Sequence, residues 1–265
     1  MRRALGIDGE KRKLLDSLHR FGKNLFSVTE ASKIMEISNE KARITLAYFT
    51  RRGWLARVKP GLYVSVPLGS INPQEYKENP WLVANRIFSP CYIGGCSAAG
   101  HWGLTDQIFN TVFVCTTKVF RRKKVKVQNV DYLLKLKKIL LHTKSTWLEN
   151  VKIQISDPTM TLIDILEDPV LGGGMRHTAE MISNYFASEH RNDHNLLQYL
   201  KESSNRTIFK RLGYIVETLD INSPEVIVAC LKNISAGYSV LDPAVKNKGT
   251  YNSRWHLRVN TDIKR

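Results

Sequence analysis

The stretch Phe26–Pro67, FSVTEASKIMEISNEKARITLAYFTRRGWLARVKPGLYVSVP, decides the fold of the first part of the chain. Its first half predicts two helices separated by a tight break at residues 36–38. We expect the first helix to run from about Thr29 to Met35 with Thr29 as its N-cap, because a hydroxyl can accept an orphan amide of the first turn. Ser38 is expected to cap the second helix, which ends at Gly53, a residue that tolerates the left-handed C′ conformation.

The second half of the stretch predicts a β-hairpin. Trp54–Val58 and Leu62–Val66 have the pattern of short strands. Lys59–Pro60–Gly61 supplies the turn between them, since Pro presets φ and Gly tolerates a positive φ. The order of helix, short turn, longer helix and basic-tipped hairpin predicts a winged helix-turn-helix, a module that lays its second helix in the major groove of DNA.

The second helix has two contrasting faces at ~100° per residue. One stripe, suited to a core, consists of Ala42, Leu46 and Phe49. The face that we expect to lie opposite consists of Lys41, Ile44, Tyr48 and Arg51. Apolar groups among cations suit a recognition helix, because they can contact thymine methyls while Lys and Arg bind phosphates or guanine edges. The alternative is that Ile44 and Tyr48 face a second domain.

These considerations give a set of expected DNA contacts in the first domain. The residues are Ser38, Asn39, Lys41, Arg43, Tyr48, Arg51 and, at the wing tip, Lys59.

Composition and charge also favour a polyanionic partner. The 265 residues suffice for two modest domains, and 43% hydrophobic content is ordinary for a globular protein. The net charge of +16 is not ordinary, and nucleic acid is the first candidate for the partner. The chain has no apolar run of membrane-spanning length, and its start, MRRALGIDGEKRK, lacks the apolar region of a secretory signal. We therefore expect a cytoplasmic protein with no membrane partner.

The cysteines predict neither disulfides nor a metal. Four cysteines in a chain of this size are typical of a reducing compartment. A zinc site drawn from Cys91, Cys96, His101 and Cys115 conflicts with the Cys91–Cys96 spacing, which is wider than that of common zinc motifs. Buried free thiols are the simpler interpretation, and we expect no metal and no cofactor.

Beyond the wing, Leu68–Pro80 is rich in Pro, Asn and Gly and reads as a linker, so we place a domain boundary near residue 75. The prediction is an α+β protein, with a winged helix-turn-helix over residues 1–75 and a mixed α+β domain over residues 76–265. The expected elements of the second domain begin with a helix that opens at Pro80 and covers Trp81–Phe88 and a short helix capped by Ser97. Strands over 108–117, 118–127, 130–141 and 151–155 and a helix capped by Asp157 come next. Four helices follow, over 176–188, 192–203, 205–212 and 224–234. The last expected element is a C-terminal strand in which Trp255, Leu257 and Val259 face inward.

The segment Lys118–Val127, KVFRRKKVKV, concentrates charge, since six of its ten residues are Lys or Arg. One interpretation is a solvated edge strand, because lysines on sheet edges block unwanted pairing. The other is a second DNA contact that holds phosphates without reading sequence. The residues assigned to this contact are Arg121, Arg122, Lys123, Lys124 and Lys126. Both interpretations stay open.

Two other features suggest enzymes only weakly. Asp157 and Asp164 could belong to a metal-dependent nuclease or transferase, but capping explains Asp157, and no third carboxylate or catalytic Lys follows in a recognisable order. The run Gly172–Gly174 lacks the preceding strand and the following GK[ST] of a phosphate loop. We therefore predict no catalytic residues.

Five motifs in a fixed order resemble the AbiEi family of transcriptional-regulator antitoxins from prokaryotic type IV toxin–antitoxin systems. They are GWLARVKPGLYV (53–64), YIGGCSAAGHWGLTDQ (92–107), ISDPTMTLIDIL (155–166), RLGYIVETL (211–219) and LDP…GTYNSRWHLRVN (241–260). The resemblance implies a winged-helix domain that binds inverted repeats in the promoter of its own operon, and a C-terminal domain linked to antitoxicity. It also implies a nucleotidyltransferase-like toxin, which need not form a stable complex with the antitoxin.

Three functions follow from these patterns. The first is a sequence-specific DNA-binding repressor, monomeric or dimeric on DNA, whose second domain acts as an antitoxin. The second is a nucleic-acid-processing enzyme, and the third is an interaction module that blocks a toxin without DNA specificity. Turnover of labelled nucleic acid separates the second from the others, and a sequence-selective gel shift separates the first from the third.

Overall fold

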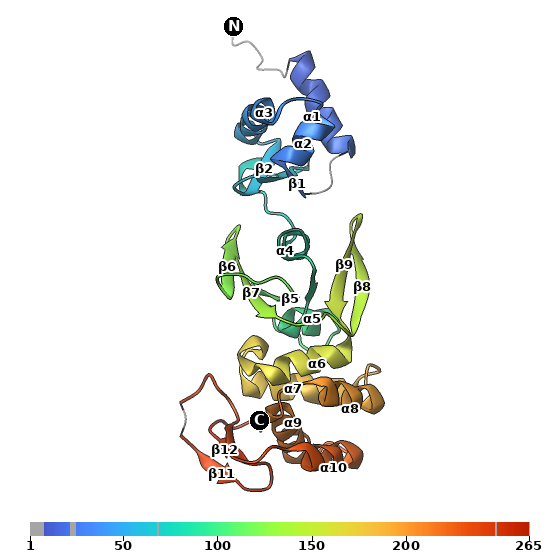
Figure 1. The fold of residues 1–265 in the computed structure, drawn as a ribbon, viewed down its shortest axis with the longest axis vertical. Coiled ribbons are helices and arrows are strands. Elements are labelled where there is room, and N and C mark those ends of the chain that lie inside the picture. Colours follow the sequence, from blue (N-terminus) through green and yellow to red (C-terminus); the bar gives the residue numbers. More distant parts are fainter. Residues whose placement is uncertain (1–7, 22–24, 68, 247, 265) are drawn as a thin grey trace. The chain divides into compact units, whose positions relative to one another are not determined.

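The computed structural model describes residues 8–21, 25–67, 69–246 and 248–264, so the first two arginines lie outside it. The chain forms two compact units (Figure 1). The first extends to Ile87 and includes the short segment Lys126–Val130, and the second contains the remainder from Phe88 onward. The division into units does not test whether residues 1–75 fold as an independent domain, so the boundary near residue 75 stays a prediction. Within the described ranges, every helix is too short or too polar to cross a bilayer.

The first unit has the element order of a winged helix. Its elements are α1 (Gly9–Phe21), β1 (Leu25–Ser27), α2 (Val28–Ile34), α3 (Asn39–Arg51), β2 (Leu55–Lys59), β3 (Leu62–Ser65), the 3-10 turn η1 (Pro73–Glu75) and α4 (Pro80–Phe88). The three strands form an antiparallel sheet in the order β1-β3-β2. The sequence pattern did not predict β1, because three residues are too few to show an alternation.

The caps of α2 and α3 differ in how well the sequence predicted them. Ser38 caps α3 as expected, and its hydroxyl accepts from the Lys41 amide at 3.2 Å. The expected cap Thr29 was wrong, since Ser27 caps α2. Ser27 forms a capping box with Glu30: the Glu30 amide donates to the Ser27 hydroxyl, and the Ser27 amide donates to the Glu30 carboxylate at 2.7 Å. Two orphan amides are satisfied together, which a cap at Thr29 would not achieve.

The predicted core stripe of α3 is confirmed. Ala42, Leu46 and Phe49 have no exposed surface, and they pack in one cluster with Leu18 of α1 and Phe26 of β1. Burial of an aliphatic or aromatic side chain contributes about 1.5–3 kcal/mol. This cluster therefore fixes the orientation of α3 against α1 and the sheet.

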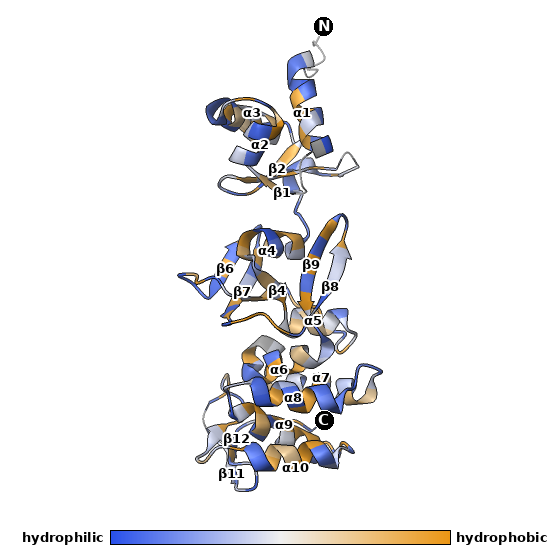
Figure 2. Cartoon of the chain, turned by 45° about the vertical axis from the view of Figure 1, so that its right-hand side comes forward, coloured by the Kyte–Doolittle hydropathy of each residue, from blue (hydrophilic) through white to orange (hydrophobic). Residues whose placement is uncertain are grey.

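The second unit combines a six-stranded mixed sheet with a helical layer and a small C-terminal sheet (Figures 1 and 2). The large sheet has the order β6-β7-β5-β4-β9-β8, with strands β4 (Cys91–Ile93), β5 (Thr111–Thr116), β6 (Lys124–Val127), β7 (Val130–Leu136), β8 (Thr143–Leu148) and β9 (Val151–Ser156). The helices are α5 (Gly95–His101), α6 (Pro158–Glu167), the 3-10 turn η2 (Pro169–Gly172), α7 (Met175–Ala187), α8 (Asp193–Glu202), α9 (Thr207–Thr218) and α10 (Pro224–Asn233). The small sheet has the order β10-β12-β11, with β10 (Ser239–Val240), β11 (Thr250–Asn252) and β12 (Leu257–Val259).

Asp157 and Pro158 open α6 as predicted, and the Asp157 carboxylate accepts from the Met160 amide at 2.7 Å. Ser97 was wrongly assigned as a cap, because α5 begins one turn earlier, after Gly94. The Ser97 hydroxyl instead accepts from the Phe113 amide at 3.0 Å and so joins α5 to β5. The helix predicted to end at Leu212 continues to Thr218, because Ile215 and Val216 keep its apolar side buried.

The predicted strand over 118–127 is confirmed only for its last four residues, β6. The chain must leave the end of β5 and return, because β5 and β7 run parallel. Residues 117–123 leave the end of β5 as irregular structure, and β6 then leads to the turn at 128–129 from which β7 begins. The Thr116 hydroxyl accepts from the Lys118 amide where the irregular segment begins. The strand predicted to extend to Leu141 likewise ends at Leu136.

The C-terminal pattern is confirmed in part. Trp255 and Leu257 are fully buried and Val259 is half-buried, but only Leu257–Val259 belongs to a strand. Trp255 lies in the turn before it and packs in the helical core.

Candidate nucleic-acid interface

The outward face of α3 carries two cations around an exposed apolar side chain. Ile44 is 67% exposed although it lies on a helix with a well-packed core. Arg51, two helical turns later, is exposed on nearly the same stripe as Ile44, and Arg43 is exposed at the edge of this face. Ser38 and Asn39 are exposed at the N-terminal end. A Cβ-branched apolar group near guanidinium groups matches the chemistry of a base edge that carries a methyl group and of the neighbouring phosphates.

Lys41 and Tyr48 lie to one side of this face, toward α1. The Lys41 ammonium is 3.5 Å from the Glu10 carboxylate of α1. Tyr48 is half-buried, and its ring centroid lies 6.0 Å from that of Trp54. The structure thus corrects the helical-wheel assignment of Tyr48 to the outermost stripe, because the ring leans onto the core beside α1 and β2.

Two cations outside the expected set of DNA contacts, Lys11 and Arg52, lie over the Tyr48 ring. The Lys11 ammonium is 5.0 Å from the ring centroid and the Arg52 guanidinium is 5.5 Å from it. The spacing of four residues between Tyr48 and Arg52 on one helix would have predicted the second contact. Lys11 is also ion-paired with the Asp8 carboxylate at 2.5 Å, so Arg52, which is exposed, is the cation that makes this flank of α3 basic.

The wing carries its charge on one side of β2. Arg57 and Lys59 are exposed, whereas the alternate residues Ala56 and Val58 are buried. Gly61 follows with a φ of +79°, as the predicted turn requires. Arg57 was not predicted as a contact, although the alternation of the strand identifies it as an outward residue.

The basic segment Lys118–Val127 divides into two parts. Arg121, Arg122 and Lys123 are exposed in the return loop, and Lys124 and Lys126 are exposed on β6, an edge strand of the large sheet. The Lys124 ammonium is paired with the Asp131 carboxylate at 2.9 Å. Among the described residues, no carboxylate is within salt-bridge distance of Lys126. The edge position and a role in phosphate binding are compatible for the same strand.

A comparison with protein families now adds to this geometry. Residues 13–66, which extend from α1 to the end of the wing, match the family described as "Transcriptional regulator, AbiEi antitoxin". The chain carries an AbiEi-type regulator domain. No curated protein matches the chain. Four of the five motifs that suggested the family lie beyond residue 66, so the likeness of the second unit to AbiEi proteins stays a prediction.

Outside the AbiEi-type domain, the structure joins residues that the sequence did not connect. The Lys137 ammonium lies 3.0 Å from the Asp164 carboxylate and 2.9 Å from that of Glu167, and Lys135 lies 2.6 Å from Glu167. Burial by itself raises the pKa of Glu167, but the two ammonium charges lower it to about 2. Tyr92 also donates to Asp164, at 3.1 Å.

The cluster brings a Lys and a further carboxylate, Glu167, next to Asp164, although no such set follows in a recognisable order in the sequence. Lys137 directly follows β7 and the carboxylates lie on α6, so their separation in sequence concealed the pairing. Both lysines are matched by carboxylates, and Asp164 has no exposed surface. A balanced, buried set of ion pairs is typical of a structural network.

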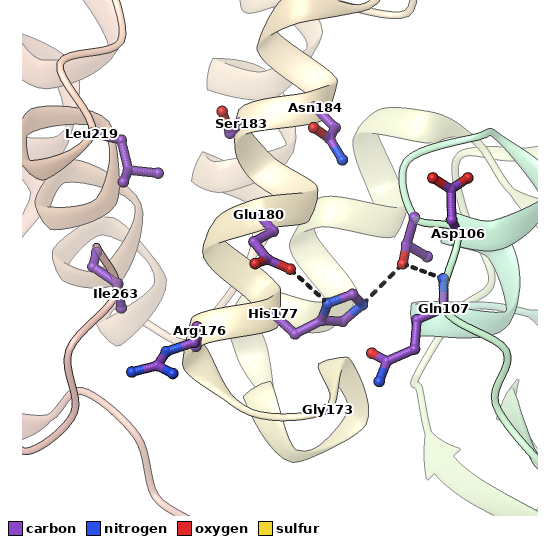
Figure 3. A pocket seen from close by; sticks show the side chains of 11 residues that line it. Asp106, Gln107, Gly173, Arg176, His177, Glu180, Ser183, Asn184, Leu219 and Ile263 are labelled. Atoms are coloured by element: carbon purple, nitrogen blue, oxygen red, sulfur yellow. Dashed lines mark hydrogen bonds and ion pairs between the residues drawn. The ribbon is translucent and has the colours of Figure 1, made fainter. Parts of the chain in front are cut away.

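A second polar group lines a pocket of about 690 Å³ beside α7 (Figure 3). His177 lies between Glu180 and Thr105, with 3.2 Å from its Nδ1 to the Glu180 carboxylate and 3.1 Å from its Nε2 to the Thr105 hydroxyl. The Thr105 hydroxyl also accepts from the Gln107 amide, and Thr105 is only 9% exposed. These hydrogen bonds connect the loop after α5 to α7. Because the Thr105 side chain is buried, they favour a structural role over attack on a substrate.

The cysteines are separate buried thiols. Burial raises the pKa of Cys91 to about 11 and that of Cys96 to about 12. The Cys115 thiol donates to the Asp164 carboxylate at 3.8 Å. The described part of the chain contains no group of three or more His, Cys, Asp or Glu residues placed to hold a metal ion.

Proposed function

We propose that the chain is a sequence-specific regulator that binds double-stranded DNA through α3 and the wing. The observation that carries the proposal is the face of α3, where Ile44 stays exposed together with Arg43 and Arg51. The buried stripe fixes α3 against the core, so this face is presented on a rigid element. Lys59 at the wing contacts the DNA backbone and Arg43 contacts base edges.

The finer proposal concerns the biological role. The family description of residues 13–66 names both a transcriptional regulator and an antitoxin. We propose that the protein acts in the cytoplasm, represses its own promoter at inverted repeats, as a monomer or dimer, and counteracts a nucleotidyltransferase-like toxin without a stable complex. The second unit provides the antitoxic function in this proposal.

The test is competition binding of purified protein to the DNA upstream of its own gene. We expect that this duplex binds more tightly than a scrambled duplex of equal length, and that binding weakens as salt increases. Arg43→Ala should cost about 1–3 kcal/mol on the specific duplex and nothing measurable on the scrambled one. Equal affinity of the wild-type protein for both duplexes would refute sequence-specific binding.

The antitoxin role has its own test. Co-expression with the product of the neighbouring gene should restore the growth of cells that this product alone arrests. A version with Arg43→Ala should still restore growth, because the proposal places antitoxicity in the second unit. Loss of rescue in that variant would contradict the division of roles.

A further inference from the structure

An open depression of about 840 Å³ lies beside the wing, within the first unit. Three cations line it, and they are Arg57, Lys77 and Lys126. The lining also includes the side chains of Gln74, Gln128 and one acid, Glu75. These residues come from three parts of the chain that are far apart in sequence.

Two hydrogen bonds join the depression to its surroundings. The Gln74 amide nitrogen donates to the Arg51 carbonyl at 3.3 Å, which connects η1 to the last residue of α3. The Glu78 amide donates to the Gln128 side-chain oxygen at 3.2 Å, which connects the segment before α4 to the tip of the β6–β7 hairpin. Gln128 and Asn129 both have positive φ, +48° and +63°, as a tight two-residue hairpin turn requires. The depression is therefore held in place by named backbone and side-chain contacts.

The charges in this depression are unbalanced. Arg57, Lys77 and Lys126 are all exposed, and in the described ranges none of the three has a carboxylate within salt-bridge distance. Lys124, two residues from Lys126 on the same strand, is instead neutralised by Asp131. Three converging cations repel one another, so an anion between them lowers the free energy. The side-chain amides add uncharged hydrogen-bond donors of the kind found around phosphate oxygens.

The depression also continues the charged side of the wing. Arg57 and Lys59 are both exposed on β2, with buried Val58 between them. Residues two apart on a β-strand are separated by about 7 Å, so a DNA backbone that contacts Lys59 passes at about that distance from Arg57. Consecutive phosphates on one DNA strand have a similar separation, so neighbouring phosphates can meet the wing tip and this depression.

We propose that Arg57, Lys77 and Lys126 form a phosphodiester-binding site that holds the DNA backbone beyond the wing. The site adds affinity that does not depend on the DNA sequence. Because it contacts DNA beyond the wing, full affinity requires a longer duplex than α3 and the wing alone would need. This inference rests on the proposed DNA-binding function, and it assigns Lys126 and Lys124, two neighbours in the basic segment, to different roles.

The test compares Lys126→Gln with the matched control Lys124→Gln. For each protein, affinity is measured over a salt series on a long duplex and on one trimmed to the specific core. Lys126→Gln and Arg57→Gln should each reduce the slope of log K against log salt by about 0.9 on the long duplex, with an unchanged preferred sequence. Lys124→Gln should leave the slope as in wild type, and all variants should be equivalent on the trimmed duplex.

A reverse variant and a competitor complete the design. Glu75→Gln should tighten binding to the long duplex, because it removes the one carboxylate in the lining. Circular dichroism melting of each variant should match wild type, since all the substituted side chains are exposed. Equal slopes for Lys126→Gln, Arg57→Gln and Lys124→Gln would overturn the inference. A second result would also overturn it: wild type binds inorganic phosphate tightly, the variants lose that binding, and their DNA affinity stays unchanged. This result would assign the site to a free anion. Failure of wild-type DNA binding would instead refute the proposed function itself.

Discussion

The exposed isoleucine of α3 provides a sharp test, because stability and DNA binding should respond to it differently. Ile44 is 67% exposed and Leu46, two residues later, has no exposed surface. Ile44→Ala removes atoms that contribute little to the core, so the free energy of unfolding should change by less than about 0.5 kcal/mol. Leu46→Ala leaves a cavity in the cluster under α3 and should cost about 2–5 kcal/mol.

The binding effect of Ile44→Ala follows from the same exposure. Complete burial of an Ile side chain is worth about 1.5–3 kcal/mol, and about two thirds of that surface remains to be covered by DNA. The variant should therefore lose about 1–2 kcal/mol of binding free energy, or about 5- to 30-fold in affinity for the specific duplex. Urea denaturation gives the stability, and fluorescence anisotropy with a labelled duplex gives the affinity.

A matched control exists elsewhere in the chain. Ile108 is 91% exposed and lies outside the AbiEi-type domain, so Ile108→Ala should change neither quantity. If Ile44→Ala binds the specific duplex as tightly as Ile108→Ala, the apolar centre of this face does not contact DNA. A loss of more than about 2 kcal/mol of stability in Ile44→Ala would show that the side chain is part of the core after all.

Three further predictions concern the second unit. Gly213→Ala places a Cβ 2.0 Å from the buried Trp255 ring and should lower the free energy of unfolding by about 3 kcal/mol in urea denaturation. Alanine in place of an exposed helical glycine usually stabilises a protein, so a stabilised variant would contradict this packing. Lys137→Met leaves the Asp164 carboxylate buried without its ion pair and should cost about 3–5 kcal/mol by the same assay, against no change for the exposed Lys138→Met. The lowered pKa of Glu167 contributes stability that is complete above pH 4.5 and is lost as the pH falls toward about 2. Glu167→Gln should therefore flatten the dependence of the free energy of unfolding on pH in that window. An equally steep dependence in the variant would refute the contribution.

The sequence predicted the first unit well because its signals are local. Ser38, the stripe of Ala42, Leu46 and Phe49, and the turn at Gly61 each act within one or two turns of the chain, and the structure has all of them. The error at Thr29 has the same scale, since Ser27 and Thr29 are both possible caps and only Ser27 stands three residues before Glu30.

The second unit exceeded what local patterns can show. The parallel pairing of β5 with β7 requires a return segment, and nothing in KVFRRKKVKV marks where loop ends and strand begins. The pairing of Lys137 with Asp164 spans elements that are distant in sequence and adjacent only after folding. Strand alternation could have identified Arg57 as an outward residue, but its proximity to Lys77 and Lys126 exists only in three dimensions.

The measurement that tests the central claim most directly is selection of bound duplexes from a randomised pool by the wild-type chain and by Arg43→Ala. The account predicts that the wild-type protein enriches one motif, and that Arg43→Ala enriches the same motif with the preference lost at a single base pair. A pool that stays unenriched, or an identical motif from both proteins, would contradict the claim that α3 reads DNA sequence.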